Sequence, residues 1–116
     1  MKKLAIVVRE DAYDRLLTPL AFAYGATASG VETDFLFVNW AVRLLFADGD
    51  PAPDSHPDQD AWLKQQVAKA GLPAEIRDII RTLKGTGKVR FHACSLAAQI
   101  FDMDPKKLIP EAEGIV

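Results

Sequence analysis

Short apolar runs alternate with segments of helical periodicity along this chain, and that alternation restricts the fold more than any other feature. The apolar runs are rich in β-branched and aromatic side chains, as buried strands are, and they cover residues 4–8, 33–38 and 88–93. Apolar residues at helical spacing follow each run, over residues 13–27, 61–70, 73–84 and 94–102. This order predicts an α/β fold with a mainly parallel sheet, right-handed crossovers and helices on both faces, which is a three-layer α/β/α arrangement.

Length and composition indicate one domain over residues 1–116. The chain has 49% hydrophobic and 26% charged residues, which is ordinary for a globular domain of 116 residues. Residues 47–60 differ from the rest, because they carry five aspartates and three prolines and no lysine or arginine. We expect this acidic, proline-rich stretch to be a surface loop.

Two segments leave alternatives open. Pro19 lies inside the first helical pattern, so that helix either begins at Thr18 with Pro19 as its first residue or starts earlier and bends at the proline. An apolar cluster follows the second strand, and it serves either as core or as an oligomer interface. Its members are Trp40, Val42, Leu44, Leu45 and Phe46.

Charge and apolar length exclude several function classes. A formal net charge of −2 provides no basic field for nucleic acid or anionic membrane. The longest apolar stretch, residues 35–47, contains Asn39 and Arg43 and falls short of the about 20 residues that span a bilayer. The apolar run at residues 4–8 is too short for a signal peptide. A single cysteine fits a reducing compartment, so we expect a soluble cytoplasmic protein.

That single cysteine, Cys94, lies between the third predicted strand and the helix that follows it. Ligands of parallel α/β folds bind outside the carboxyl ends of the strands, and a helix start stabilises a thiolate or holds an anion. Cysteine is also among the most frequently buried residue types. Cys94 is therefore either a reactive thiol or a structural core residue.

Polar residues near Cys94 are candidates for supporting roles. His92 and Arg90 share a strand face with Cys94, and His92 can lower the pKa of the thiol or relay its proton. The alternative is that both are polar residues at the rim of the sheet. Arg9 and Asn39 follow the first two strands, so we expect them at the same edge as Cys94.

Other cysteine and ligand chemistries lack their motifs. A second cysteine for a Cys-x-x-Cys motif is absent, and a phosphatase-type or rhodanese-type loop would need arginine where Ile100 stands. No glycine-rich loop follows the first strand, which argues against nucleotide binding. The acidic stretch around His56 departs from the EF-hand pattern. We expect no metal site and no cofactor.

Four segments together resemble the DsrE/DsrF-like family. A helix of small residues at 23–30 looks like the first helix of that family, and residues 34–45, with Asn39 and Trp40, resemble its second strand and the loop beyond. The segment Phe-His-Ala-Cys-Ser-Leu-Ala-Ala at 91–98 is similar to its cysteine segment. Leu108 and Ile109 with the acidic residues after them also fit.

The resemblance implies a three-layer α/β/α fold, homo-oligomers that are often trimers or hexamers, and a role in sulfur relay. Cys94 would accept sulfane sulfur as a persulfide, or carry thiosulfate, and pass it to a TusA-type carrier or a rhodanese. Ser95 and nearby backbone amides would hydrogen-bond the persulfide. The alternative is a non-catalytic oligomeric module of the same fold that binds a ligand or a partner.

Two departures from the family pattern stand out. Some members have a second cysteine, which this chain lacks, so a two-cysteine relay is not expected. Family members usually continue with a further helix and strand after a segment like 111–116, where this sequence ends. We therefore expect a fold that lacks those two elements or completes them from a neighbouring subunit.

Overall fold

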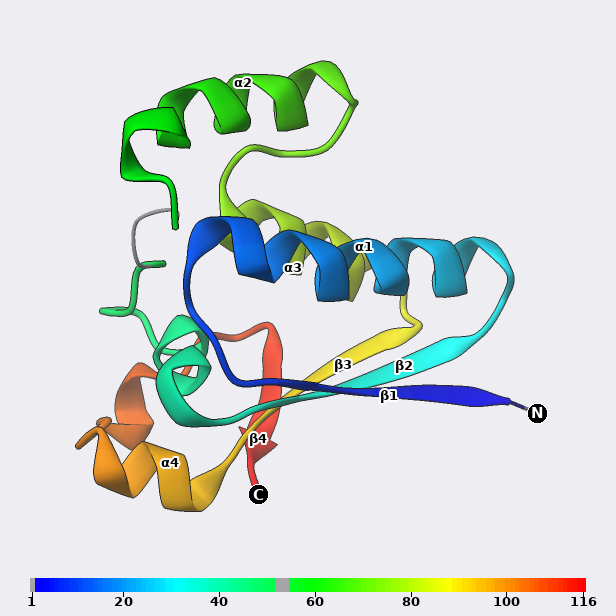
Figure 1. Ribbon diagram of the computed structural model, residues 1–116. Helices are drawn as coiled ribbons and strands as arrows, with labels where there is room; N and C mark the ends of the chain where they lie inside the picture. Colours follow the sequence, from blue (N-terminus) through cyan, green and yellow to red (C-terminus); the bar gives the residue numbers. More distant parts are fainter. Residues whose placement is uncertain (1, 52–54) are drawn as a thin grey trace.

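The sheet of this protein is entirely parallel. A computed structural model describes residues 2–51 and 55–116, and residues 52–54 of the predicted acidic loop lie outside the described residues. The described strands pair in sequence order, and they are β1 (Lys3–Val8), β2 (Glu32–Phe37), β3 (Val89–Ala93) and β4 (Ala112–Ile115). The predicted α/β class with a parallel sheet is confirmed (Figure 1).

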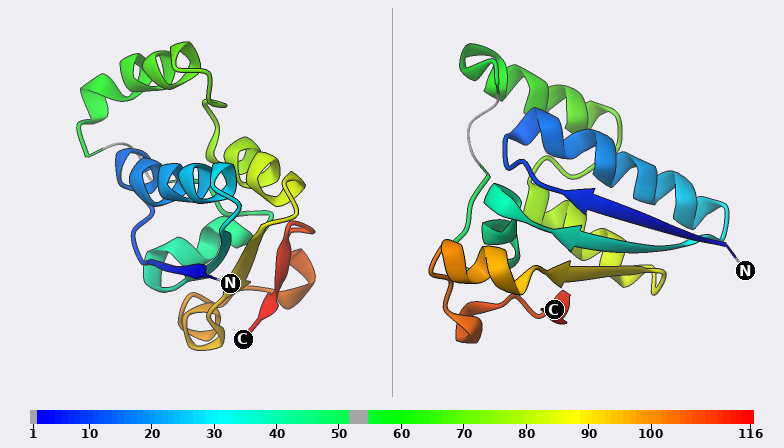
Figure 2. Two further views of the ribbon diagram at one scale, coloured as in Figure 1. Left: turned by 90° about the vertical axis from the view of Figure 1, so that its right-hand side faces the viewer. Right: turned by 60° about the horizontal axis from the view of Figure 1, so that its bottom comes forward.

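Helices lie on both sides of the sheet. The α-helices are α1 (Tyr13–Ala28), α2 (Asp60–Lys69), α3 (Ile76–Gly85) and α4 (Ser95–Ile100). Short 3₁₀ helices are η1 (Asn39–Leu45), η2 (Pro57–Gln59) and η3 (Pro105–Lys107). Figure 2 shows α1 and α3 against one face, α2 farther out above them, and α4 on the opposite side near the carboxyl ends of the strands. The third layer is the short α4, so most of the face of β1 and β2 away from α1 stays open.

Strand alternation divides the sheet into a buried face and an open face. Side chains facing α1 and α3 are buried, among them Phe35 and Phe91, whose parallel rings stack 5.0 Å apart. Helix α3 contributes its apolar stripe to the same core, through Ile76, Ile79, Ile80 and Leu83. The other residues of β2 and β3, including Asp34, Arg90 and His92, are only partly buried. The open face is therefore where polar chemistry has room.

The alternative for Pro19 is resolved by α1, which runs without interruption from Tyr13 to Ala28. Pro19 lies inside this helix, so a start at Thr18 is wrong. A proline at this point removes one backbone N–H donor from the helix. The helix ends before Gly30, whose φ of +75° suits a residue without a Cβ atom.

The apolar cluster after β2 divides into two parts. Four of its members are buried, namely Val42, Leu44, Leu45 and Phe46, so the core interpretation is confirmed for them. Trp40 is 55% exposed, and its ring lies 4.9 Å from that of Phe101, just beyond α4. The interface interpretation stays open for Trp40 alone. Among the described helices, none is long and apolar enough to cross a membrane.

Candidate functional site

The carboxyl ends of β1, β2 and β3 are in register. Val8 pairs with Phe37, and Phe37 pairs with Ala93. The ladder continues one step further, because the N–H of Val38 donates to Val8 O at 2.9 Å and the N–H of Cys94 donates to Phe37 O at 3.1 Å. Arg9, Asn39 and Cys94 therefore lie at the same edge of the sheet. Within the described residues, no hydrogen bond or ion pair joins their side chains.

Cys94 is a half-buried thiol at the junction of β3 and α4. Its backbone is extended, with φ −70° and ψ 125°, and its carbonyl accepts the N–H of Ala98 at 2.9 Å. The side chain makes no capping hydrogen bond to the helix. The side chain packs against the edge of the hydrophobic core and is not used to hold the helix start. Helix α4 has six residues, so its dipole is small compared with that of a long helix.

The chain beyond β4 encloses Cys94 from one side. The N–H of Val116 donates to Ala93 O at 2.8 Å, and the N–H of Ser95 donates to Val116 O at 2.7 Å. Val116 therefore binds the residues on both sides of Cys94. Because the Ser95 N–H is already used, only the exposed hydroxyl of Ser95 is left to donate to a sulfur anion. Of the donors predicted for the persulfide, namely Ser95 and nearby backbone amides, the Ser95 N–H alone is thereby taken.

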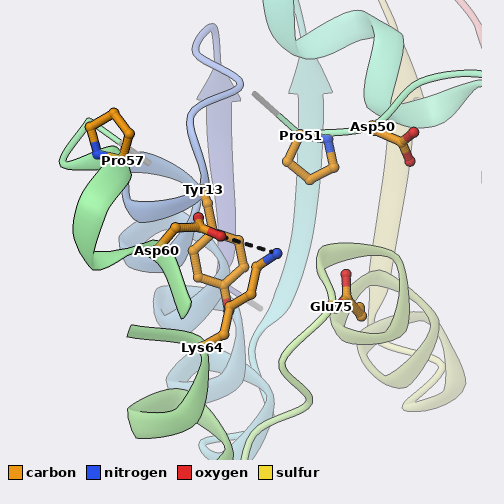
Figure 3. Close-up of a pocket in the computed structure, with 7 residues that line it drawn as sticks. All are labelled: Tyr13, Asp50, Pro51, Pro57, Asp60, Lys64 and Glu75. Atoms are coloured by element: carbon orange, nitrogen blue, oxygen red, sulfur yellow. Dashed lines mark ion pairs between the residues drawn. The ribbon is translucent and has the colours of Figure 1, made fainter. Parts of the chain in front are cut away.

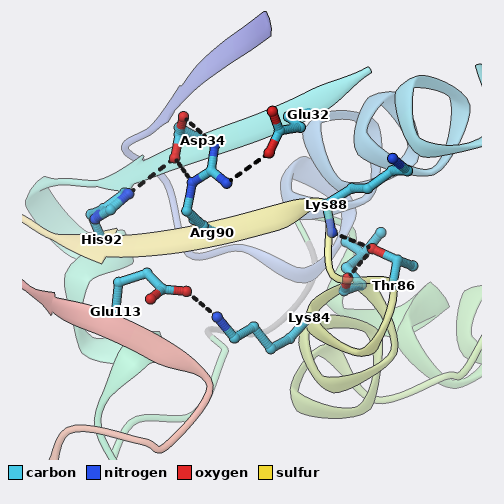
Figure 4. A network of polar contacts seen from close by, with 9 residues as sticks. Glu32, Asp34, Lys84, Thr86, Lys88, Arg90, His92 and Glu113 are labelled. Carbon is cyan, nitrogen blue, oxygen red and sulfur yellow. Dashed lines mark hydrogen bonds and ion pairs between the residues drawn. The ribbon is translucent and has the colours of Figure 1, made fainter. Parts of the chain in front are cut away.

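A chain of charged groups crosses the open face and ends at His92 (Figure 4). His92 Nε2 lies 3.2 Å from Asp34 Oδ1. Arg90 donates to the same carboxylate through Nε at 2.7 Å and through Nη2 at 3.1 Å, and to Glu32 Oε1 through Nη1 at 3.0 Å. Two acids on β2 are thus tied to two bases on β3.

These contacts set the ionisation of Asp34. The hydrogen bond from Arg90, and to a smaller extent that from His92, lower the pKa of Asp34 from 3.8 to about 2 in spite of partial burial. Asp34 is therefore a carboxylate at neutral pH and accepts from the Nε2–H of His92. Figure 4 shows the other ring nitrogen of His92, Nδ1, on the side away from Asp34.

A β-bulge places His92 at an irregular point of the sheet. Phe91 pairs with Ala112 while His92 pairs with Gly114, so Glu113 is an extra residue on β4. Bulges of this kind occur next to functional sites, where they change the direction of a side chain. Gly114 adds no side chain beside the imidazole, and Glu113 is turned to an ion pair with Lys84, which lowers the pKa of the glutamate.

An apolar groove runs over the open face next to this polar chain. It encloses about 400 Å³ and is lined by Ala5, Val7, Leu36 and Val116, with Asp34 and His92 also in its wall. Nothing in the strand pattern alone predicts this groove, because it depends on α4 leaving β1 and β2 uncovered. Leu36 is the partner of His92 in the β2–β3 register, so the apolar and polar walls meet there.

A second hollow lies on the helical side, at the amino ends of α1, α2 and α3 (Figure 3). It also encloses about 400 Å³. Lys64 lies in it, 3.4 Å from Asp60, with its ammonium 5.2 Å from the centre of the Tyr13 ring. Asp50 and Glu75 are further lining residues. Cys94 does not line this hollow, and none of the candidate site residues predicted from the sequence does, although part of the acidic stretch 47–60 lines it.

The remaining predicted site residues have simple surroundings. Arg9 is exposed. Asn39 is exposed as well and has φ +49°, a left-handed conformation that asparagine tolerates better than most residues. The backbone turn into η1 thus accounts for an asparagine at this place. Within residues 2–51 and 55–116, no group of three or more histidine, cysteine or acidic side chains is arranged to hold a metal ion.

Asp34 and Glu32 are the site residues that the sequence pattern did not single out. The alternation in β2 already assigns both to the face opposite Phe35. Their contact with Arg90 and His92 requires the register of β2 against β3, which pairs Asp34 with Arg90. This register is a property of the folded sheet.

Comparisons with known proteins bear on the fold. No family model matches the chain, and no curated protein matches it. A solved structure described as "Structure of Protein of Unknown Function MTH1491 from Methanobacterium thermoautotrophicum" aligns with 100% of this chain and 82% of that one, at a TM-score of 0.61 and 18% sequence identity. At 18% identity this likeness shows a shared fold and nothing further, and that fold is of the α/β class.

Proposed function

We propose that this protein is a sulfur carrier or sulfurtransferase in which Cys94 holds sulfane sulfur, as a persulfide or as bound thiosulfate, and passes it to a partner thiol. One observation carries the proposal. A half-buried thiol lies at the carboxyl edge of a parallel sheet, two residues beyond a histidine held by Asp34. Ligand chemistry of α/β folds gathers at this edge, and the thiol is not used in capping the helix.

The chemistry needs no cofactor and no net oxidation. The Cys94 thiolate attacks the outer sulfur of a donor R–S–SH, and a bond forms between the two sulfurs. The donor S–S bond breaks, and its electron pair leaves on R–S⁻, which takes up the proton that Cys94 gave up. With thiosulfate, sulfite leaves instead. An acceptor thiolate then removes the outer sulfur from Cys94 by the same exchange.

Neighbouring side chains have supporting roles in this proposal. His92 relays the proton between Cys94 and the leaving thiolate, while Asp34 keeps its ring oriented. The hydroxyl of Ser95 donates a hydrogen bond to the persulfide. Arg9, exposed at the same edge, attracts anionic donors such as thiosulfate, and Asn39 shapes the turn next to them.

We further propose that the protein is a homo-oligomer, as a trimer or hexamer, and works in the cytoplasm with a TusA-type carrier or a rhodanese. Support for self-association comes from large apolar side chains that stay exposed around α4. Leu96 and Ile100 are 64% and 68% exposed and lie one helical turn apart, and Trp40 lies on Phe101 next to them. A single cysteine agrees with a reducing compartment.

The alternative function is a non-catalytic oligomeric module that binds a ligand or a partner. The open groove over Val7 and Leu36 favours it, because this groove exists whether or not Cys94 reacts. The two functions differ in what happens to the sulfur of Cys94.

Loading of Cys94 distinguishes them. Wild-type protein and Cys94→Ser are incubated with thiosulfate, and the sulfite released is counted while the intact proteins are weighed. A carrier gains one sulfur atom (about 32 Da) on the wild type alone with one sulfite released for each sulfur gained, or holds thiosulfate without a covalent bond, seen as a mass increase only under native conditions. No adduct, or an equal adduct on Cys94→Ser, would contradict the carrier function and favour the non-catalytic module.

A further inference from the structure

The groove on the open face has an apolar surface and a polar group of residues at one end. Val7 and Val116 are 63% and 62% exposed, and Ala5 and Leu36 extend the apolar wall between them. His92 and Asp34 form the polar end. A volume of about 400 Å³ falls within the range of small-molecule sites, which typically combine apolar walls with a few polar groups.

The charged groups at the polar end are already satisfied by one another. Asp34 Oδ1 accepts from Arg90 and from His92, and Asp34 Oδ2 accepts from Arg90. Arg90 also donates a hydrogen bond from Nη1 to Glu32 Oε1. An ionic ligand would have to compete with these pairs. His92 also lines the groove, and the carboxylate of Asp34 holds its Nε2.

We infer that this groove binds a small uncharged molecule with an apolar body and one hydrogen-bonding group, the body on Val7, Leu36 and Val116 and the polar group beside the imidazole of His92. An anion is disfavoured because it would lie beside the carboxylate of Asp34. A cation finds both oxygens of Asp34 occupied.

The groove is connected to Cys94 through Val116, although Cys94 itself does not line it. Val116 lines it and is hydrogen-bonded to the residues before and after Cys94. If Cys94 carries sulfur, which rests on the proposed function, the molecule in the groove is the donor, an organic persulfide R–S–SH with an apolar R. Its outer sulfur moves to the Cys94 thiolate, the donor S–S bond breaks, and the thiol R–SH is released with the proton relayed by His92. No oxidant or reductant is needed.

Binding is tested without any reaction. Cys94→Ser protein, labelled with ¹⁵N, is titrated with benzyl alcohol and separately with benzoate, and amide shifts are followed by NMR. Benzyl alcohol is expected to shift the amides of β1, β2 and Val116 at concentrations where benzoate does not. Two substitutions are then made in this background. Val7→Glu places a charge on the apolar wall, and His92→Phe removes the polar ring nitrogens while keeping a ring, so each is expected to weaken binding about tenfold.

The control substitution is Phe22→Glu, at a residue of α1 that is 62% exposed on the opposite side of the sheet. It should leave binding within about twofold. Shifts confined to other surfaces, benzoate binding as tight as benzyl alcohol, or equal loss with Phe22→Glu would overturn the assignment. Far-ultraviolet circular dichroism shows whether each variant is folded, and an unfolded Val7→Glu is replaced by Leu36→Asn.

A sulfur-transfer experiment provides the second test of the groove. Wild-type protein is offered benzyl persulfide and, in parallel, thiosulfate, and loading rates are compared. The groove predicts faster loading from benzyl persulfide, and the uncharged variant Leu36→Asn should slow this donor about tenfold while leaving thiosulfate within about twofold. Loading from both donors with no effect of Leu36→Asn refutes the groove as the donor site but keeps the carrier function. Binding of benzyl alcohol with no loading from either donor refutes the carrier and keeps the groove.

Discussion

His92 Nε2 lies 3.2 Å from Oδ1 of Asp34, a residue 58 positions earlier in the chain and on the neighbouring strand. The side chains are partly buried, at 26% and 33% exposure, and Arg90 holds the other side of the same carboxylate. This contact orients the imidazole beside the groove and beside the strand end that carries Cys94. Protonation of Asp34 at low pH is therefore expected to change the stability of the fold.

Asp34 is predicted to stabilise the protein above about pH 4 and to lose this effect as the solution is acidified through about pH 2. The reason is that the folded protein lowers the pKa of Asp34 from 3.8 to about 2, chiefly through Arg90, so unfolding takes up a proton in this window. With allowance for solvent exposure, the contribution is roughly 1–2 kcal/mol.

Urea unfolding at pH 6 and pH 2 measures this effect. The difference in unfolding free energy between the two pH values should shrink in Asp34→Asn by roughly 1–2 kcal/mol. Asp58→Asn, which changes an exposed carboxylate on η2, serves as the control and should keep the wild-type difference. An identical pH dependence in Asp34→Asn and wild type would contradict the role given to Asp34.

Thr33→Val is predicted to leave stability unchanged or to raise it by about 1 kcal/mol. Thr33 is fully buried in β2, and its hydroxyl oxygen has no hydrogen-bond partner within the described residues. Valine has nearly the same shape and removes the buried polar atom. Thr86→Val is the matched control, because that hydroxyl donates to Leu83 O at 2.6 Å and accepts from the N–H of Lys88.

Chemical denaturation of both threonine variants gives the comparison. Thr86→Val should be destabilised by about 1 kcal/mol, since two hydrogen bonds at the end of α3 are lost. A loss of the same size in Thr33→Val would mean that the Thr33 hydroxyl has a stabilising partner.

Two glycines are predicted to respond to alanine in opposite directions. Gly25 lies inside α1 with nothing within 4 Å of an added Cβ, so Gly25→Ala should stabilise by about 0.5–1 kcal/mol. At Gly49 an added Cβ would lie 1.7 Å from the carbonyl oxygen of Arg43, so the backbone there has to move. Gly49→Ala should destabilise by about 1–3 kcal/mol.

Thermal unfolding of the two variants, measured side by side, shows the sign of each change. A drop in melting temperature for Gly25→Ala, or no drop for Gly49→Ala, would contradict this prediction. Gly49 also matters for packing, since its carbonyl accepts from Arg77 at 3.0 Å.

Self-association is predicted to depend on the exposed apolar residues of α4. Light scattering of the wild type should give particles several times the 12.7 kDa chain mass. Ile100→Glu should shift them toward that mass, because a charge would be placed in the contact. Phe22→Glu, on α1, should not. Particles of 12.7 kDa at every concentration of the wild type would reject the oligomer.

Much of this fold was predictable from local pattern, and the edge carrying Cys94 was predictable with it. The strands, the helices after them and the carboxyl-edge position of Cys94 follow from periodicity and from right-handed parallel connections. The last helix was predicted over 94–102, yet α4 ends at Ile100, and Asp102 with φ +53° lies in the left-handed region just beyond it.

The site itself depends on contacts between distant segments. Asp34 meets His92 only because β2 and β3 pair in one particular register. The Ser95 amide is taken by Val116 because the chain after β4 crosses beside it. The groove is open because α4 is too short to cover β1 and β2. Each of these follows from tertiary packing, on which local sequence patterns carry little information.

Discharge of sulfur from Cys94 tests the carrier function most directly. Protein loaded with sulfane sulfur is separated from the donor and mixed with reduced glutathione as the acceptor thiol, with no dithiothreitol present. Its intact mass is followed over time beside that of Cys94→Ser treated in the same way. The carrier account predicts that the wild type gains one sulfur atom (about 32 Da) on loading and loses it to the acceptor, while Cys94→Ser never gains it. A wild type that gains no sulfur, or one that gains it equally without Cys94, would contradict the account.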